Sequence, residues 1–341
     1  MKTMAYKRSV LIFLVAVLFM LGAFSLRVGA VEASLKEVIM ALGRTGPNFF
    51  VFIIYEIRLP RLVLAMLVGA SLGMCGAALQ GLFRNPLADP GLIGVSSGAA
   101  LGAVLVIVLG EGFLAQYVIF WGYFALPLAA FAGGGLVTLI VYAIASRQGS
   151  TDISLLLLTG IAMGTLLSAC TGLLTYFASD EALRSLTFWS MGSVASATWQ
   201  SVLMVLPCTL TALCILPLAG RALNAMLLGE HVAYQSGHNI KRLKQLIIGV
   251  VALTVGSAVA ASGMIGFVGL VSPHLTRLLL GADNRYVLLG SALMGSILLL
   301  IADMISRVVV APAELPIGIP MALVGGVFFI WLLLRRQRTM R

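Results

Sequence analysis

The sequence G-L-F-R-N-P-L-A-D-P-G-L-I-G-V-S-S-G-A-A, Gly81 to Ala100, separates two long apolar runs of the chain. Its spaced glycines suggest a phosphate-binding loop, but such a loop needs a preceding strand, a following helix and usually a lysine. Here an apolar run precedes the glycines and no lysine follows them. Prolines break a helix, and an aspartate accepts hydrogen bonds from nearby backbone. We therefore predict a turn at the inner mouth of a helical membrane protein, formed by Arg84, Asn85, Pro86, Asp89 and Pro90.

The composition around this turn is that of a membrane protein. Of 341 residues, 60% are hydrophobic and 10% charged, whereas soluble domains carry roughly 25% charged residues. No polar segment is long enough for a separate soluble domain, so we expect one all-α, polytopic membrane domain over residues 1–341. Ten apolar runs fit transmembrane helices, approximately Ser9 to Ala30, Pro60 to Leu82, Leu92 to Gly110, Phe120 to Ser146, Asp152 to Phe177, Thr198 to Ala219, Leu243 to Ser262, Phe267 to Leu280, Arg285 to Val309 and Ile317 to Leu334.

Two features of these runs concern packing. The eighth has only 14 residues, so we expect it to be short, irregular or partly buried in protein. Small residues recur every four positions, at Gly69 and Gly73 on the second run and at Gly94, Gly98 and Gly102 on the third. Such spacing predicts close approach between helix backbones and needs no ligand.

The basic residues predict the orientation. An even number of spans puts both termini on one side, and with both in the cytoplasm 15 Lys and Arg residues lie inside and 7 outside. Excess positive charge is typical of the cytoplasmic side. The net charge of +10 is therefore explained by membrane orientation, and we expect lipid contact and no nucleic acid. A cleaved signal peptide ending near Ala30 is the alternative for the first run. It would leave nine spans and would place either the basic C-terminal tail or the basic inner loop outside the cytoplasm.

Several function classes find no support in the residues. Acidic residues fall at span ends or in loops, with Asp303 the deepest and able to pair with Arg307 four residues later. An ion-coupled carrier usually places acids or histidines mid-membrane, so this class, or a passive channel, stays an alternative. No motif of the form G-x-x-x-x-G-K-[ST] occurs, and no cluster suggests a metal site. We expect no enzyme activity and no cofactor on this chain.

The largest inner loop, Arg221 to Lys244, follows the sixth run. We predict two short helices in it, over residues 222–228 and 230–236, broken at Gly229. Glu230 suits the first turn of the second helix and Gly237 suits its end. From the residues alone, such a pair of helices lies on lipid or docks into a partner.

Seven motifs in one order now identify a family. They are R-L-P-R (Arg58 to Arg61), G-A-A-L-Q-G-L-F-R-N-P-L-A-D-P-G-L-I-G-V-S-S-G (Gly76 to Gly98), F-W-S-M-G-S (Phe188 to Ser193), L-G-E-H-V-A-Y-Q-S-G (Leu228 to Gly237), G-F-V-G-L-V-S-P-H-L-T-R (Gly266 to Arg277), A-D-M-I-S-R (Ala302 to Arg307) and A-E-L-P-I-G (Ala313 to Gly318). Together they resemble the iron-chelate and cobalamin permease family, the transmembrane subunits of type II ABC importers.

The resemblance implies a ten-span permease that acts as a homodimer in the bacterial inner membrane. Two ATPase subunits, which use ATP and Mg²⁺, are expected on the cytoplasmic face, and a periplasmic binding protein is expected to deliver the substrate. The coupling segment, residues 221–241, matches the family's ATPase-docking helices through Leu228, Gly229, Glu230, His231, Ala233 and Gly237. Arg58, Arg61 and Arg307 match outer-face arginines that pair with glutamates of the binding protein, and an arginine can hold both oxygens of a carboxylate.

The resemblance favours heme as the substrate. The run T-Y-F-A-S-D-E-A-L-R-S-L-T-F-W-S-M-G-S, Thr175 to Ser193, is most similar to the heme branch of the family, with ferric siderophores and cobalamin as alternatives. We expect Tyr176, Phe188 and Trp189 at the translocation path or gate. No histidine is predicted on the outer half as an axial iron ligand, but a path must also release its cargo, so this absence does not decide between the substrates.

Overall fold

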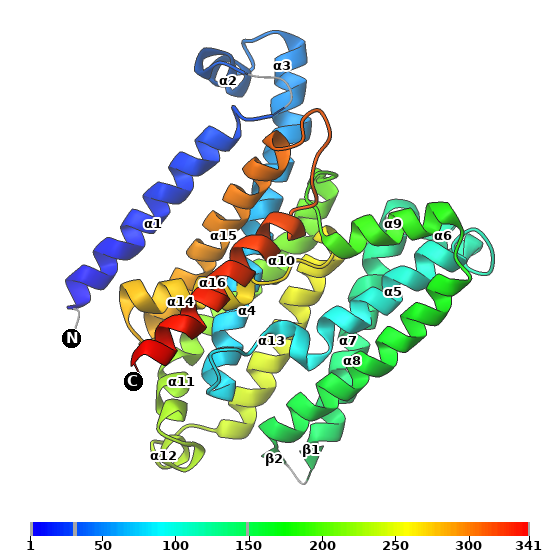
Figure 1. The fold of residues 1–341 in the computed structure, drawn as a ribbon. Helices are drawn as coiled ribbons and strands as arrows, with labels where there is room; N and C mark the ends of the chain where they lie inside the picture. The colour runs from blue at the N-terminus through cyan, green and yellow to red at the C-terminus, as the bar shows by residue number, and fades with distance from the viewer. Residues whose placement is uncertain (1–2, 30–32, 148–149, 340–341) are drawn as a thin grey trace.

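A computed structural model describes residues 3–29, 33–147 and 150–339 of the chain, and these parts are almost entirely helical (Figure 1). Ten apolar helices coincide with the ten predicted spans, which confirms the predicted fold class. Seven of the described helical segments are long and apolar enough to cross a membrane, and three more apolar helices are shorter. The ten helices are α1 (Met4–Ser25), α4 (Leu59–Phe83), α5 (Val95–Leu109), α7 (Ala125–Ala145), α8 (Ile153–Tyr176), α10 (Trp199–Ile215), α13 (Ile240–Ser262), α14 (Val268–Leu280), α15 (Asn284–Val308) and α16 (Gly318–Thr339).

Shorter elements connect these helices. At one end of the molecule, α2 (Leu35–Leu42) and α3 (Asn48–Phe52) lead through a π-helical stretch, η1 (Ile53–Arg58), directly into α4. Two 3-10 turns, η2 (Pro90–Ile93) and η4 (Leu216–Ala219), flank α5 and α10. The others are α6 (Ala115–Trp121), η3 (Gly122–Phe124), α9 (Asp180–Met191), α11 (Gly220–Leu227), α12 (Glu230–Gln235) and a hairpin of β1 (Ser146–Arg147) with β2 (Ser150–Thr151). The predicted first span extended to Ala30, which lies outside the described residues, whereas α1 ends at Ser25.

Helix α4 is the centre of the core, and 83% of its most apolar window is buried. It packs against α10, α13, α14 and α15, while α5 and α7 pack on each other and on α8, and α13 contacts both groups. The crossing of α4 and α15 depends on Gly69 and Gly295: a Cβ at Gly69 would stand 2.4 Å from the Gly295 carbonyl oxygen. The predicted packing role of Gly69 is therefore confirmed, since only glycine permits this approach.

Helix α14 is short for a physical reason. The chain turns back after α13 through Gly263 and Phe267, which both adopt positive φ, and α14 then begins at Val268 and has 13 residues. The turn packs against protein, because the Trp189 carbonyl oxygen lies 2.1 Å from the position of a Cβ on Gly263. A half-length span is tolerated in a membrane where its irregular end is covered in this way.

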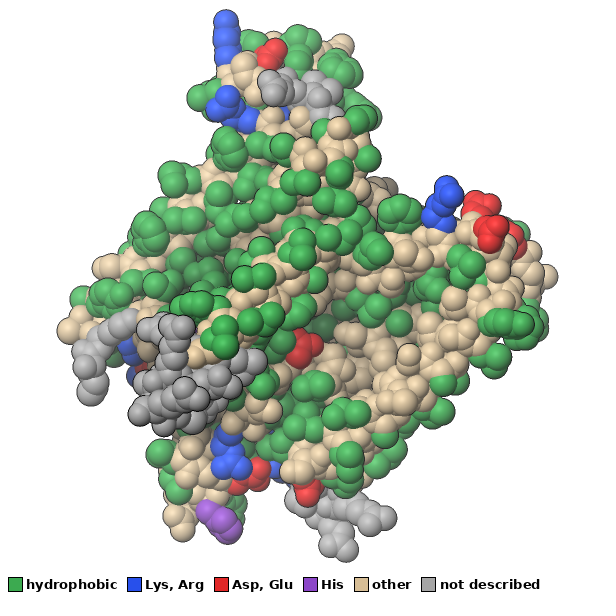
Figure 2. All heavy atoms as spheres, in the orientation of Figure 1, with side chains coloured by type: hydrophobic (Ala, Val, Ile, Leu, Met, Phe, Trp, Pro, Cys, Tyr) green, Lys and Arg blue, Asp and Glu red, His purple; other side chains and the backbone are tan. Residues whose placement is uncertain are grey.

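The surface has the distribution of a membrane protein. Apolar side chains cover the flanks, and charged side chains gather mainly at the two ends of the molecule and at the tip near α9 (Figure 2). The start of α1 and the end of α16 both lie in the lower half of the view, toward the end that carries α11 and α12 (Figure 1). Helix α8 is the most open of the long spans, with only 17% of its window buried.

Candidate functional site

The end of α15 that lies away from α11 and α12 (Figure 1) holds a buried cluster of charges. Asp303 on α15 accepts hydrogen bonds from Arg61 Nε at 2.9 Å and from Arg307. The Nη1 atom of Arg61 also donates to both oxygens of Glu314, at 2.9 and 2.8 Å. The pairing of Asp303 with Arg307 on one helical face, predicted from their spacing, is confirmed. One buried carboxylate therefore holds two guanidinium groups side by side.

Arg307 and a third arginine, Arg58, bind carbonyl oxygens at the end of α1. Arg58 Nη1 donates to the carbonyl oxygen of Leu26 at 2.5 Å, and Arg307 Nη1 donates to the carbonyl oxygens of Ser25 and Val28, both at 3.2 Å. The last carbonyl groups of a helix lack partners within the helix, and a cation placed there is favoured by the helix dipole. Arg58, the last residue of η1, and Arg307 on α15 thus hold the end of α1 in place.

The three predicted docking arginines lie close to one another, but their side chains do not project outward. Arg58, Arg61 and Arg307 are only 5%, 5% and 4% exposed. Among the described residues, Arg27, Lys36 and Arg44 are exposed basic side chains at this end, and Arg184 is exposed on α9. The sequence does not reveal the burial of Arg61, because its partner Asp303 is 242 residues away along the chain.

The coupling segment at the opposite end has the predicted form of two short helices. Gly229 separates α11 from α12 with φ of +118°, a conformation that favours glycine. Gly237 (φ +85°) follows α12, and the N–H of His238 donates to the Ala233 carbonyl oxygen at 3.2 Å. Ala233 is buried, whereas His231 is exposed. The sequence signals of Gly229 and Gly237 were therefore sufficient to locate this element.

Apolar side chains protrude from the coupling segment. Leu228 and Tyr234 are 74% and 71% exposed, and Leu227 and Val232 are also exposed. The glycine between the helices is open, since a Cβ on Gly229 would meet nothing within 4 Å. Exposed apolar groups gathered at a protein surface are typical of a contact site for a partner.

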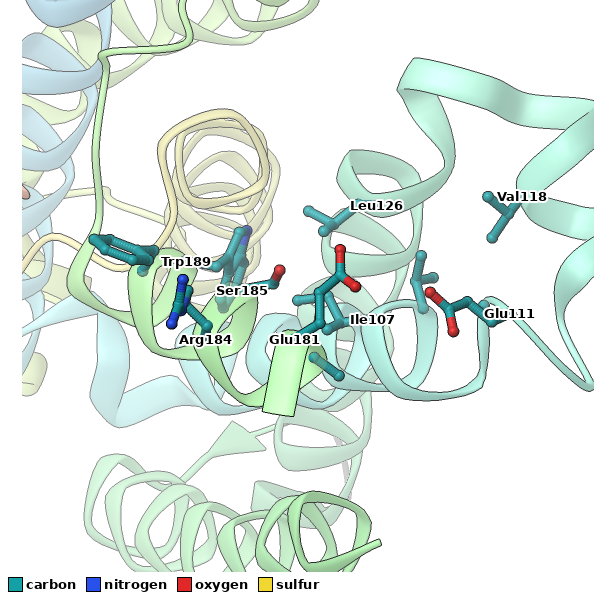
Figure 3. Close-up of a pocket in the computed structure, with 12 residues that line it drawn as sticks. Ile107, Glu111, Val118, Leu126, Glu181, Arg184, Ser185 and Trp189 are labelled. Atoms are coloured by element: carbon teal, nitrogen blue, oxygen red, sulfur yellow. The ribbon is translucent and has the colours of Figure 1, made fainter. Parts of the chain in front are cut away.

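A cavity of about 600 Å³ lies between α9, the end of α5 and the start of α7 (Figure 3). Its wall is apolar at Ile107 and Leu126, and the carboxylates of Glu111 and Glu181 project into it (Figure 3). A second cavity of about 320 Å³ lies beside it, near the end of α13.

The three predicted path residues divide between the cavities and the surface. Phe188 and Trp189 line both cavities, so these two neighbours on α9 lie between two hollows of the protein. Tyr176 at the end of α8 is 82% exposed and lines neither of the two cavities. The structure therefore brings together Phe188 and Trp189, but not Tyr176.

The turn after α4 begins as expected. Arg84 ends the helix in the left-handed conformation and is exposed, as is Pro86. The Asn85 Oδ1 atom accepts a hydrogen bond from the Leu87 N–H at 3.0 Å, and the Asp89 Oδ1 atom accepts one from the Gly91 N–H at 2.8 Å. The prediction that Asp89 bonds to nearby backbone is confirmed.

The second half of this turn packs inside the protein. Asp89 and Pro90 contact Gly269, which also packs on Leu72, halfway along α4. Asp89 lines a cavity of about 270 Å³ with residues of α4, α13 and α14. Asp89 lies in the loop that caps η2, which agrees with the prediction that acids lie at span ends or in loops, and this loop packs among the helices. The turn folds back against α4 and α14, which apolar runs in a sequence do not reveal.

Comparison with known proteins gives an independent assignment. The model of the FecCD transport family matches residues 14–335. The hemin transport system permease protein HmuU of Yersinia pestis is 43% identical over 335 residues, which are 97% of this chain and 96% of that protein. The vitamin B12 import system permease protein BtuC of Salmonella paratyphi A is 42% identical over 288 residues, 84% of each chain. A solved structure of a metal-chelate type ABC transporter in an inward-facing conformation is similar with a TM-score of 0.85 and 32% identity, over 96% of this chain and 99% of that chain.

Proposed function

Because this chain belongs to the FecCD transport family and is a permease subunit of the type II ABC importers, we propose that it carries heme or a related iron chelate from the periplasm to the cytoplasm. The observation that carries this proposal is the 43% identity to a hemin permease along 97% of the chain. Cobalamin is the second candidate, because the similarity to the vitamin B12 permease is almost as high, over 84% of the chain.

The ATP that drives import is hydrolysed by a separate subunit in this proposal. Two ATPase subunits dock on the α11–α12 end, and the exposed side chains of Leu228 and Tyr234 support this contact. Both termini then lie in the cytoplasm of a bacterial cell, since the start of α1 and the end of α16 lie toward the same end as α11 and α12. The membrane is the inner membrane, and the excess of basic residues on this side agrees with that orientation.

The working unit in this proposal is a homodimer with the substrate path at its interface. Helix α8 supports this, because it is the least buried long span and its exposed apolar side chains offer a surface that a second copy can cover. Leu158, Ile161, Leu166 and Leu173 are exposed along α8. Phe188 and Trp189, which line both cavities beside α9, gate the path from the periplasmic side, and Tyr176 lies at the entrance.

The binding protein docks at the opposite end, over the arginine cluster. Glu314 supports this role, because its half-exposed carboxylate already binds Arg61 Nη1 through both oxygens. A glutamate of a binding protein can offer the same chemistry from outside. In this proposal the partner's carboxylate displaces Glu314 from Arg61, while Arg58 and Arg307 hold the rim in place and the exposed Arg27 and Lys36 attract the acidic partner.

A growth assay tests the substrate. Cells that lack their own heme and cobalamin importers are supplied with this permease, its ATPase and its binding protein, and heme is offered as the sole iron source. We expect growth on heme, and none when the ATPase carries an inactivating substitution. Growth restored only in the cobalamin-dependent assay would replace heme by cobalamin, and growth that persists with the inactive ATPase would contradict ATP-driven import.

A further inference from the structure

A buried lysine joins the coupling segment to the rest of the molecule. Lys244, in the second turn of α13, is only 4% exposed. Its Nζ atom lies 2.8 and 2.9 Å from the two oxygens of Glu230 and donates to the carbonyl oxygen of Thr151 at 2.8 Å. Three elements therefore meet at one ammonium group: α12, α13 and β2.

The chemistry of Lys244 makes this junction specific. An ammonium group buried without partners is strongly unfavourable, and removing one partner of a buried ion pair is far more damaging than replacing both. The ammonium group of lysine donates up to three hydrogen bonds and accepts none. The junction consequently needs a donor at position 244, because Thr151 offers a carbonyl oxygen.

The contact with Thr151 leads directly to α8. Thr151 precedes Asp152, whose carboxylate accepts hydrogen bonds from the N–H groups of Ser154 and Leu155 in the first turn of α8. Glu230, at the other side of the junction, is the first residue of α12 after Gly229. Two hydrogen-bonded contacts of Lys244 therefore connect α12 to the segment that starts the most exposed long span.

The first half of the coupling segment is anchored elsewhere. Asn224 on α11 donates to the carboxylate of Asp283 at 2.7 Å and accepts a hydrogen bond from the N–H of Asn284 at 2.8 Å, at the start of α15. The two halves are joined at Gly229, whose surroundings are open. Helix α11 is therefore bonded to the start of α15, and α12 is bonded to α13 and, through Lys244, to the segment before α8. Gly229 lies between these two halves.

We propose that Lys244 is a positioning residue that couples α12 to α8, so that a movement of the docked ATPase reaches the helix that borders the substrate path. This inference rests on the proposed ATPase contact at α11–α12, and it names the residue that transmits the movement. Glu230 and the Thr151 carbonyl group are the two contacts through which Lys244 acts.

The first test is the substitution Lys244→Met, with Arg242→Met as the matched control. Arg242 is exposed, lies two residues earlier on the same helix and is outside the coupling segment. We expect the Lys244→Met permease to bind the ATPase, and the complex to hydrolyse ATP at the unmodified rate, but to transport about 10-fold less substrate per ATP. The control is expected to transport normally. Unchanged transport per ATP in Lys244→Met would overturn the inference.

The exchange of the two charges gives a sharper result. In the double variant Glu230→Lys with Lys244→Glu, an ion pair can re-form, but a glutamate at position 244 cannot donate to the Thr151 carbonyl oxygen. We expect no recovery of coupling in the exchanged protein, and recovery in Lys244→Arg, which keeps a donor. Full recovery by the exchange would show that only the ion pair matters and would overturn the link to α8.

A distance measurement keeps the inference testable if Lys244→Met fails to fold. Spin labels are attached at Gln235 on α12 and at Ser154 on α8, both exposed, in a chain whose native cysteines are replaced. We expect this distance to stay constant when ATP is added to the full complex, since the junction moves as one body, and a change in it would overturn the inference. If the unmodified complex shows no ATP-driven transport at all, the proposed function fails instead.

Discussion

The substitution Asp303→Asn tests the buried charge cluster most severely. Asp303 has 0% exposed side-chain area and lies between Arg61 and Arg307, whose side chains are 6% and 3% exposed. Asparagine keeps the size of the side chain but removes the only fully buried negative charge at this point and places an N–H group against a guanidinium. Breaking such a buried pair costs about 3–5 kcal/mol of unfolding free energy.

A matched control is available on the same arginine. Glu314 also binds Arg61 Nη1 at 2.8 Å, but its side chain is 38% exposed. Exposed ion pairs contribute about 0–1 kcal/mol, so Glu314→Gln is expected to have a small effect. The two variants should differ by about 2–5 kcal/mol, which is a factor between about 30 and about 5,000 in the folding equilibrium.

Denaturant titration of the purified protein in detergent, followed by tryptophan fluorescence, measures this difference. The account predicts a large shift of the unfolding midpoint for Asp303→Asn and a small one for Glu314→Gln. Equal shifts in the two variants would refute the reasoning from burial. A stabilised Asp303→Asn variant would show that the two arginines find other partners.

Three further predictions follow from packing, pH and docking. Gly69→Ala should destabilise the protein by about 1–3 kcal/mol because its Cβ would meet the α15 backbone at 2.4 Å, whereas Gly135→Ala, with nothing within 4 Å, should be neutral in the same titration. Hydrogen bonds from Arg285 hold the pKa of Asp283 below its ordinary value, so its stabilising contribution is present at neutral pH and is lost as the pH falls below about 4; Asp283→Asn should remove that acid dependence. Glu314→Gln should bind the binding protein more tightly in a surface-plasmon measurement, and weaker binding would contradict the proposed exchange of carboxylates.

Local signals in the sequence were sufficient for much of the fold. The apolar runs located the ten spans because a helix that crosses a bilayer must satisfy its own backbone and expose apolar side chains. Gly229 and Gly237 located the coupling helices because both positions have positive φ. The spacing of Gly69 and Gly73 predicted a close helix crossing, and that crossing is present.

Long-range contacts explain what the sequence did not reveal. The burial of Arg61 depends on Asp303 and Glu314, more than 240 residues away, and no local pattern indicates such partners. Asp89 lies beside the middle of α4 because its turn folds back against Gly269, although the residues around it are those of an ordinary surface turn. The contact of Lys244 with Glu230 and Thr151 likewise joins three separate segments.

Transport in proteoliposomes tests the central claim most directly. The purified permease is reconstituted with its ATPase, and heme bound to the binding protein is added outside with ATP inside. The account predicts heme accumulation that requires ATP, the ATPase and the binding protein together. Heme accumulation by this chain alone, driven by an ion gradient without ATPase, would contradict it.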